Sequence, residues 1–249
     1  MKTIKILLLL IFAVTVAKAQ DKEFALAGEY YQNGEYTKAI EVYDSILNSG
    51  SESWELYYNL GNARFKKEDY AKAILNYEKA KKLNPGNEDI NYNLGLANTR
   101  IADKIEPIPE FFLKRLWRSF TNIFSEKQWA AATIVLWALV MMFTYIFFTA
   151  RTGRRKKTSF WLGITMLIMS IVAGQAGYSK YRAVTQHNTA IVMTPTVNVK
   201  SSPASESSDL FVLHQGTKVK LLVKIKDWYQ IRLANGNKGW IKAADVEKI

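Results

Sequence analysis

The chain has 249 residues, a formal net charge of +12 at neutral pH, two histidines and no cysteine. The lack of cysteine excludes disulfide bonds and thiol chemistry, and we find no motif for phosphate binding, zinc catalysis or nucleophilic hydrolysis. We therefore expect no catalytic residue, no cofactor and no metal site. The positive charge lies mostly in the first 19 residues and beside two apolar runs, so we expect no nucleic acid partner.

Residues 1–19 have the pattern of a cleavable secretory signal peptide. Lys2 and Lys5 precede an apolar stretch that is too short to span a bilayer comfortably, and a small-x-small site at 17–19 precedes Gln20. The mature chain would then begin outside the cytoplasm. The alternative is an uncleaved anchor, which would still leave the following segment outside if it entered with its N-terminus inside.

Residues 20–104 repeat with a period of 34, which predicts pairs of antiparallel helices. Small residues at fixed points let the two helices approach closely, and tyrosine and leucine fill the gaps between pairs. The recurring positions are Leu26/Leu60/Leu94, Ala27/Gly61/Gly95, Tyr36/Tyr70, Ala39/Ala73, Ile40/Ile74 and Tyr43/Tyr77. The pattern resembles the tetratricopeptide (TPR) repeat. We expect the third repeat to supply only its first helix, because Pro107 falls where the second helix should carry its packing alanine.

The resemblance implies that the inner face of the first helices binds a peptide or a partner helix. Asn62 and Asn93 match two positions of a carboxylate clamp found in some relatives, but Tyr58 stands where that clamp has lysine. We therefore expect no true clamp for a C-terminal carboxylate. The alternative for each residue is an ordinary solvated surface position. The candidate binding residues are Tyr58, Asn59, Asn62, Phe65, Lys66, Tyr92, Asn93 and Arg100.

Residues 105–127 are expected to form a linker, broken by Pro107 and Pro109, followed by an amphipathic helix over 111–124. Aromatic and aliphatic residues cluster on one side of this helix, and Lys114, Arg115 and Arg118 lie on the other. Such a helix suits the headgroup layer of a membrane. Alternatively, its apolar face packs on the repeats as their missing last helix. The sequence leaves both possibilities open.

Two uncharged runs, 128–150 and 158–179, are long enough to be transmembrane helices. The loop 151–157 between them is basic and too short for a domain, so the hairpin places both flanking modules on the same side, with the loop in the cytoplasm. No ionisable residue lies inside either run, which argues against a transporter. The small residues Gly163, Ser170, Gly174 and Gly177 predict close helix packing, against the first run or against a partner helix.

Residues 180–189 are expected to be a tether of at most about 30 Å, and 190–249 a barrel of about five strands. Val219, Leu221, Val223 and Ile225 alternate with polar residues, and Asn235-Gly236 predicts a tight turn. The pieces 197–203, 213–217, Trp228 and 239–241 resemble a bacterial SH3-type domain. Relatives bind cell-wall peptides or protein segments, with Trp228 and Tyr229 as candidates here. Alternatively Trp240 and one of these two fill the core, which we favour for Trp240. We expect His214 to be a structural loop residue.

The predicted fold class is thus a multidomain membrane protein: α-helical TPR repeats, two transmembrane helices and a C-terminal all-β SH3-like barrel. This order resembles BatE, the repeat-bearing member of the Bacteroides aerotolerance (Bat) operon proteins. The resemblance implies an inner-membrane component beside von Willebrand A-type membrane proteins and a MoxR-type AAA ATPase, with a role in tolerance to oxidative stress. Our hypothesis is a non-catalytic adaptor with both modules in the periplasm. The alternative is an envelope anchor or sensor whose barrel binds peptidoglycan.

Overall fold

The computed structural model describes residues 22–109, 111–185 and 188–249. The expected signal peptide, 1–19, lies outside the described residues. The chain divides into two compact units. One unit joins the segment up to Ile108 with the segment from His187 onwards, and the other is Pro109–Gln186. The helical repeats and the barrel therefore belong to one unit, although a helical hairpin separates them in sequence. We call them the array–barrel unit and the hairpin unit.

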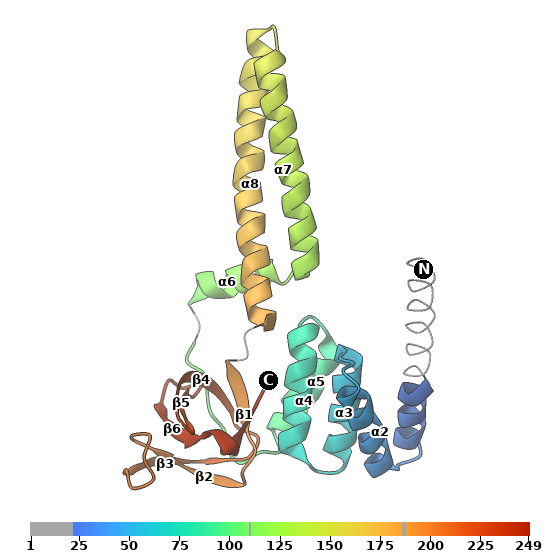
Figure 1. Ribbon diagram of the computed structural model, residues 1–249, viewed down its shortest axis with the longest axis vertical. Coiled ribbons are helices and arrows are strands. Elements are labelled where there is room, and N and C mark those ends of the chain that lie inside the picture. Colours follow the sequence, from blue (N-terminus) through green and yellow to red (C-terminus); the bar gives the residue numbers. More distant parts are fainter. Residues whose placement is uncertain (1–21, 110, 186–187) are drawn as a thin grey trace, which may run out of the picture. The chain divides into compact units, whose positions relative to one another are not determined.

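From residue 22 onwards the repeat array has five helices, as the 34-residue period predicted (Figure 1). Each of the last three begins with a polar side chain that accepts a hydrogen bond from the backbone N–H three residues later: Ser53, Asp69 and Asn87. Period-related residues such as Ala39 and Ala73 are buried. The helices cover 22–32, α2 Tyr36–Asn48, α3 Trp54–Lys66, α4 Tyr70–Leu83 and α5 Glu88–Asn98.

Gly61 provides the close approach between α3 and α4. A Cβ atom at this position would lie 2.7 Å from the ring of Tyr77, which is buried and donates a hydrogen bond to Asn62. We expect Gly61→Ala to destabilise the protein by about 1–2 kcal/mol, because overpacking outweighs the gain in helix propensity. Gly95 is the matched control, since it stands one repeat later and no atom of the described residues lies within 4 Å of an added Cβ. Gly95→Ala should be neutral or stabilising. Urea unfolding of both variants tests this, and equal effects would contradict it.

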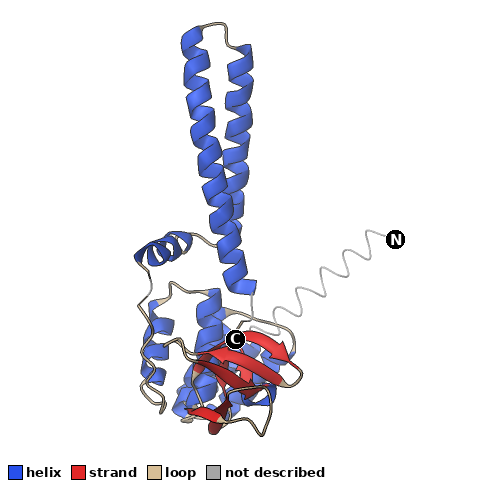
Figure 2. Ribbon diagram, turned by 90° about the vertical axis from the view of Figure 1, so that its left-hand side faces the viewer, coloured by secondary structure: helices blue, strands red, loops and turns tan. Residues whose placement is uncertain are grey.

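The hairpin unit contains α6 Phe112–Thr121, α7 Glu126–Thr149 and α8 Gly153–Thr185. Helices α7 and α8 lie side by side, and both are long and apolar enough to cross a membrane (Figures 1 and 2). Two predicted boundaries are wrong. Most of the basic loop 151–157 belongs to α8, and the predicted tether 180–189 is helical as far as Thr185. Between Gly177 and Thr185 the chain has no glycine or proline that would end the helix, so hydrogen bonding continues beyond the apolar run.

The barrel is a strongly curved antiparallel sheet of seven strands rather than about five (Figure 2). The additional pairing comes from two short strands, β1 and β7, which pair with each other near the ends of the barrel segment. The order is β3-β2-β6-β5-β4-β1-β7. The strands are β1 Thr189–Val192, β2 Thr196–Lys200, β3 Asp209–His214, β4 Lys218–Ile225, β5 Trp228–Arg232, β6 Lys238–Lys242 and β7 Val246–Lys248.

Two predictions about the barrel core are wrong. Val219 and Leu221 are buried, but Val223 and Ile225 are exposed, because a register shift between Leu221 and Val223 interrupts the alternation. Trp240 is only partly buried and lies outside the core cluster, since its neighbours Gly239 and Ile241 are the inward-facing residues of β6. The core of the barrel consists of Ala190, Val192, Val197, Val199, Leu213, Val219, Leu221, Ile231, Leu233 and Ile241.

Candidate recognition surfaces

The barrel packs against the end of the array where the second helix of a third repeat would lie. Ile191 and Ile249 of the barrel share one buried cluster with residues of α4 and α5, including Ile74 and Ala97. Met193 and Ile101 pack against the edge of the same cluster. The sequence correctly predicted that the third repeat supplies only one helix. The structure adds that β-strands cover the surface that this repeat leaves open.

Asp103 ties the barrel to the segment that follows α5. One carboxylate oxygen accepts hydrogen bonds from the backbone N–H of His214, at 2.7 Å, and from Thr217 Oγ1, at 2.6 Å. The other oxygen lies 2.8 Å from His214 Nδ1. Burial raises the pKa of Asp103, but the hydrogen bonds from Thr217 and His214 outweigh it, so the pKa is lowered. His214 therefore has a structural contact here, as expected, but it is the last residue of β3 and not a loop residue.

Further contacts extend this interface on both sides. Lys218 pairs with Glu78 at 2.6 Å, and Lys79 pairs with Glu247 at 3.5 Å. The segment after α5 continues along the barrel, where Ile105 packs against the core cluster. The array and barrel are thus joined by apolar packing, a half-buried carboxylate and surface ion pairs. Outside this interface, the array and the barrel each have a surface that could bind a partner.

On the array, three of the eight candidate residues form a hydrogen-bond network within the protein. Asn93 Nδ2 donates to Tyr58 Oη and to Asn62 Oδ1, both at 2.9 Å, and Tyr77 Oη donates to Asn62 Oδ1 at 2.8 Å. This network links α3, α4 and α5. The two asparagines that suggested part of a clamp therefore hold helices together, which agrees with the expectation that no true carboxylate clamp is present.

The other five candidates differ in exposure. Phe65 is half-buried and packs edge-on against Tyr70, with ring centroids 5.4 Å apart. Asn59 is half-buried, whereas Lys66 and Arg100 are exposed. Tyr92 is 72% exposed, so its aromatic ring is available for contact with a partner. We regard Tyr92 as the strongest contact candidate on this face.

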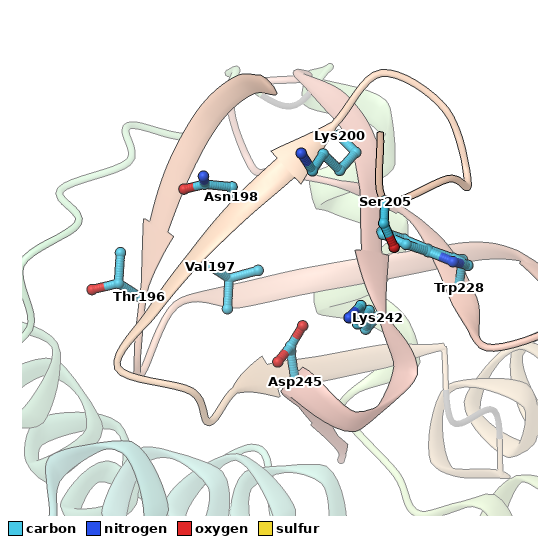
Figure 3. Close-up of a pocket in the computed structure, with 8 residues that line it drawn as sticks. All are labelled: Thr196, Val197, Asn198, Lys200, Ser205, Trp228, Lys242 and Asp245. Carbon is cyan, nitrogen blue, oxygen red and sulfur yellow. The ribbon is translucent and has the colours of Figure 1, made fainter. Parts of the chain in front are cut away.

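On the barrel, a pocket with a volume of about 430 Å³ lies over β2, β5 and β6. Figure 3 shows Thr196 and Trp228 at opposite ends, with Lys242 and Asp245 between them. Asp245 accepts a hydrogen bond from Thr194, and Lys200 pairs with Asp209 at 2.6 Å. An aromatic side chain, an ammonium group and a carboxylate in one open pocket can bind an extended polar peptide. The lining residues are Thr196, Val197, Asn198, Lys200, Ser205, Trp228, Lys242 and Asp245.

The two aromatic residues predicted for this groove have different positions. Trp228 lines the pocket, whereas Tyr229 packs against the barrel core. Lys224 and Lys248 lie over the Tyr229 ring, at 5.5 and 5.6 Å from its centroid. Trp228 and Tyr229 are successive residues of β5, and successive side chains point to opposite faces of a sheet. Sequence reasoning missed Lys242 and Asp245, which lie beyond the hairpin turn and carry no recognisable motif.

In the hairpin unit, the three glycines among the four predicted packing residues face α7. An added Cβ would lie 3.6 Å from Phe143 at Gly163, and 3.8 Å from Thr133 at Gly174. At Gly177 it would lie 3.1 Å from Cβ of Trp129, and Ser170 is buried. Of the two alternatives, packing against the first apolar run or against a partner helix, the structure has the first. The small residues let α8 approach α7 closely.

Comparisons with known families agree with both recognition modules. A family model of the TPR repeat matches residues 61–100, and a model of the bacterial SH3 domain matches residues 195–247. No curated protein is similar to the chain. The domain description inferred from the sequence is thus confirmed for both modules. Domains of these two kinds suggest binding to proteins or to peptidoglycan.

Proposed function

We propose that this chain is a non-catalytic adaptor that is anchored in a membrane by α7 and α8 and holds other proteins through its array–barrel unit. The length and apolar composition of the two helices support the anchor. The TPR and SH3 matches support protein binding. Because bacterial SH3 domains are consistent with the cell envelope, we propose the inner membrane as the location, with both modules in the periplasm.

One observation carries the proposal most strongly: a single folded unit has two separate open surfaces. The residues that line the barrel pocket are different from those that pack against the array. Docking of the barrel therefore leaves both Trp228 and Tyr92 accessible. Two weak contacts with one partner, or with two partners of the same complex, then act at high effective concentration.

The order of the domains supports a more specific proposal, an aerotolerance complex of the Bat type. In it the chain would position von Willebrand A-type membrane proteins relative to a system with a MoxR-type ATPase. The sequence has no cysteine, so this chain offers no thiol for a redox reaction. Its contribution to oxidative-stress tolerance would be to assemble the complex.

Co-purification tests the adaptor. We expect the full chain, purified in mild detergent after crosslinking of native membranes, to retain specific membrane proteins. Tyr92→Ala and Trp228→Ala should each reduce recovery of a partner, by up to about 30-fold for an interface hot spot. Val223→Ala is the control for the barrel, because this exposed apolar residue lies outside the pocket lining. Recovery of no specific membrane protein would contradict the proposal.

The pocket also favours a second function, an anchor or sensor that binds peptidoglycan. The bacterial SH3 match and the combination of Trp228, Lys242 and Asp245 support it. Sedimentation of the detergent-solubilised full chain with purified cell wall distinguishes the two functions. Cosedimentation that is lost in Trp228→Ala but kept in Val223→Ala would favour the anchor. Retention in the supernatant would disfavour it.

A further inference from the structure

Helix α6 is attached to one end of the α7/α8 pair and runs across it, not along it (Figure 1). The Trp117 side chain donates a hydrogen bond to Ser179 Oγ at 3.4 Å, and Lys180 Nζ donates to Asn122 Oδ1 at 2.8 Å. Phe120 packs on Trp129, with ring centroids 5.1 Å apart. These contacts attach α6 to the hairpin, an arrangement that neither sequence alternative specified.

Only part of the apolar face of α6 is used in these contacts. Phe120 and Trp117 lie toward the hairpin, but the other side of the apolar arc is exposed. The exposed fractions are 59% for Phe112, 64% for Leu116 and 62% for Ile123, which follows the helix. An apolar strip of this size needs an apolar environment.

The rest of the helix surface has the opposite character. Lys114, Arg115 and Arg118 occupy the polar arc, and α6 contains no acidic residue. A positively charged face beside an exposed aromatic and aliphatic face is the composition of helices that lie in the headgroup layer of anionic membranes.

The hairpin residues beside α6 have the composition expected at the membrane–water interface. Trp129, Tyr178 and Tyr181 lie near this end of α7 and α8, and both tyrosines are more than half exposed. Tryptophan and tyrosine concentrate at the boundary between headgroups and acyl chains. A helix that crosses two membrane-spanning helices at this level lies in the plane of that boundary.

We propose that α6 is an interfacial helix that binds the surface of the bilayer crossed by α7 and α8. Phe112, Leu116 and Ile123 enter the acyl boundary, and Lys114, Arg115 and Arg118 bind anionic headgroups. This inference rests on the proposed membrane anchor and goes beyond it, because a hairpin can span a bilayer while α6 remains in water. The partner is a lipid surface rather than a second protein.

The lack of native cysteine allows a direct test with single-cysteine variants of the full chain. Leu116→Cys, Lys114→Cys and Ile134→Cys would each carry an environment-sensitive fluorophore after reconstitution into phosphatidylcholine vesicles with or without phosphatidylglycerol. Ile134 is exposed in the middle part of α7 and reports on the span. We expect a lipid-borne nitroxide to quench the label at 116 several-fold more than aqueous iodide does. The label at 114 should show the reverse, and phosphatidylglycerol should increase lipid quenching at 116.

The label at 134 separates failure of this inference from failure of the anchor. If lipid nitroxide does not reach 134, the hairpin does not span the bilayer and both proposals are overturned. If 134 is quenched by lipid but 116 is quenched by iodide, α6 lies in water and only the present inference is overturned. Protection of 116 from both quenchers would mean that protein covers the strip, which also overturns it. Lipid quenching at 116 that is unchanged by phosphatidylglycerol would overturn the role of anionic headgroups.

Discussion

Gly216→Ala is expected to lower the free energy of unfolding by about 2–5 kcal/mol and to loosen the barrel from the array. Gly216 has a φ of +90°, which costs other residues about 1–2 kcal/mol. An added Cβ would also lie 2.5 Å from Cγ2 of Ile101 and 3.4 Å from Cδ1 of Ile74. The methyl group of Ile101 is fixed next to its backbone, so it cannot move aside easily, and such overpacking costs about 1–3 kcal/mol more.

Gly50→Ala is the matched control for backbone strain. Gly50 also has a φ of +90°, but within the described part of the chain an added Cβ would meet no atom closer than 4 Å. This variant should lose only about 1–2 kcal/mol. Urea unfolding of the full chain in detergent, followed by tryptophan fluorescence, gives both values. If Gly216→Ala costs no more than Gly50→Ala, the close packing of the barrel loop on Ile101 does not contribute to stability.

Asp103→Ala is expected to destabilise the array–barrel interface by about 2–4 kcal/mol. The change leaves the backbone N–H of His214 and the hydroxyl of Thr217 without their acceptor, and Thr217 is buried. Each buried polar group that loses its partner costs about 1–3 kcal/mol. The control is Glu247→Ala, which removes an ion pair with Lys79 across the same interface. Because Glu247 is exposed, that change should cost less than about 1 kcal/mol.

The same carboxylate makes stability depend on pH. Its pKa in the folded protein is below the ordinary value of about 4, so its contribution is complete above that value. As the pH falls through the lowered pKa, the Asp103 carboxylate of the folded protein takes up a proton and this contribution is lost. Urea midpoints of the native chain and of Asp103→Ala should therefore converge at acidic pH. A constant difference down to about pH 3 would show that the charge of Asp103 is not involved.

The helices of the array and the two apolar helices could be predicted because their signals are local. Leu60 and Leu94 recur at 34 residues and are both buried, and long apolar runs have a clear length. The boundaries were predicted less well, because α8 continues past the apolar run to Thr185 through residues that do not interrupt a helix. In the barrel, alternation predicted Val219 and Leu221 correctly and failed where the strand has a bulge.

The candidate sites could be predicted only in part, because exposure depends on what packs nearby. Asn62 and Asn93 have the residue type of a binding face, yet their side chains bond to each other and to two tyrosines. Trp228 lines a pocket, but Tyr229 next to it faces the core. No pattern indicated Asp103, because its partners follow 111 and 114 residues later.

By itself the sequence determined the local periods: the 34-residue repeat, the two apolar runs, the amphipathic character of 111–124 and the alternation of short strands. These follow from which side of a helix or strand must avoid water, and that information can be read along the chain, within one element or by comparing one repeat with the next. Only the tertiary structure decided that the barrel replaces a repeat helix, that Asp103 and Gly216 hold it there, and that α6 packs on the hairpin. Those choices depend on shape and on unpaired polar groups that meet only after distant segments fold together.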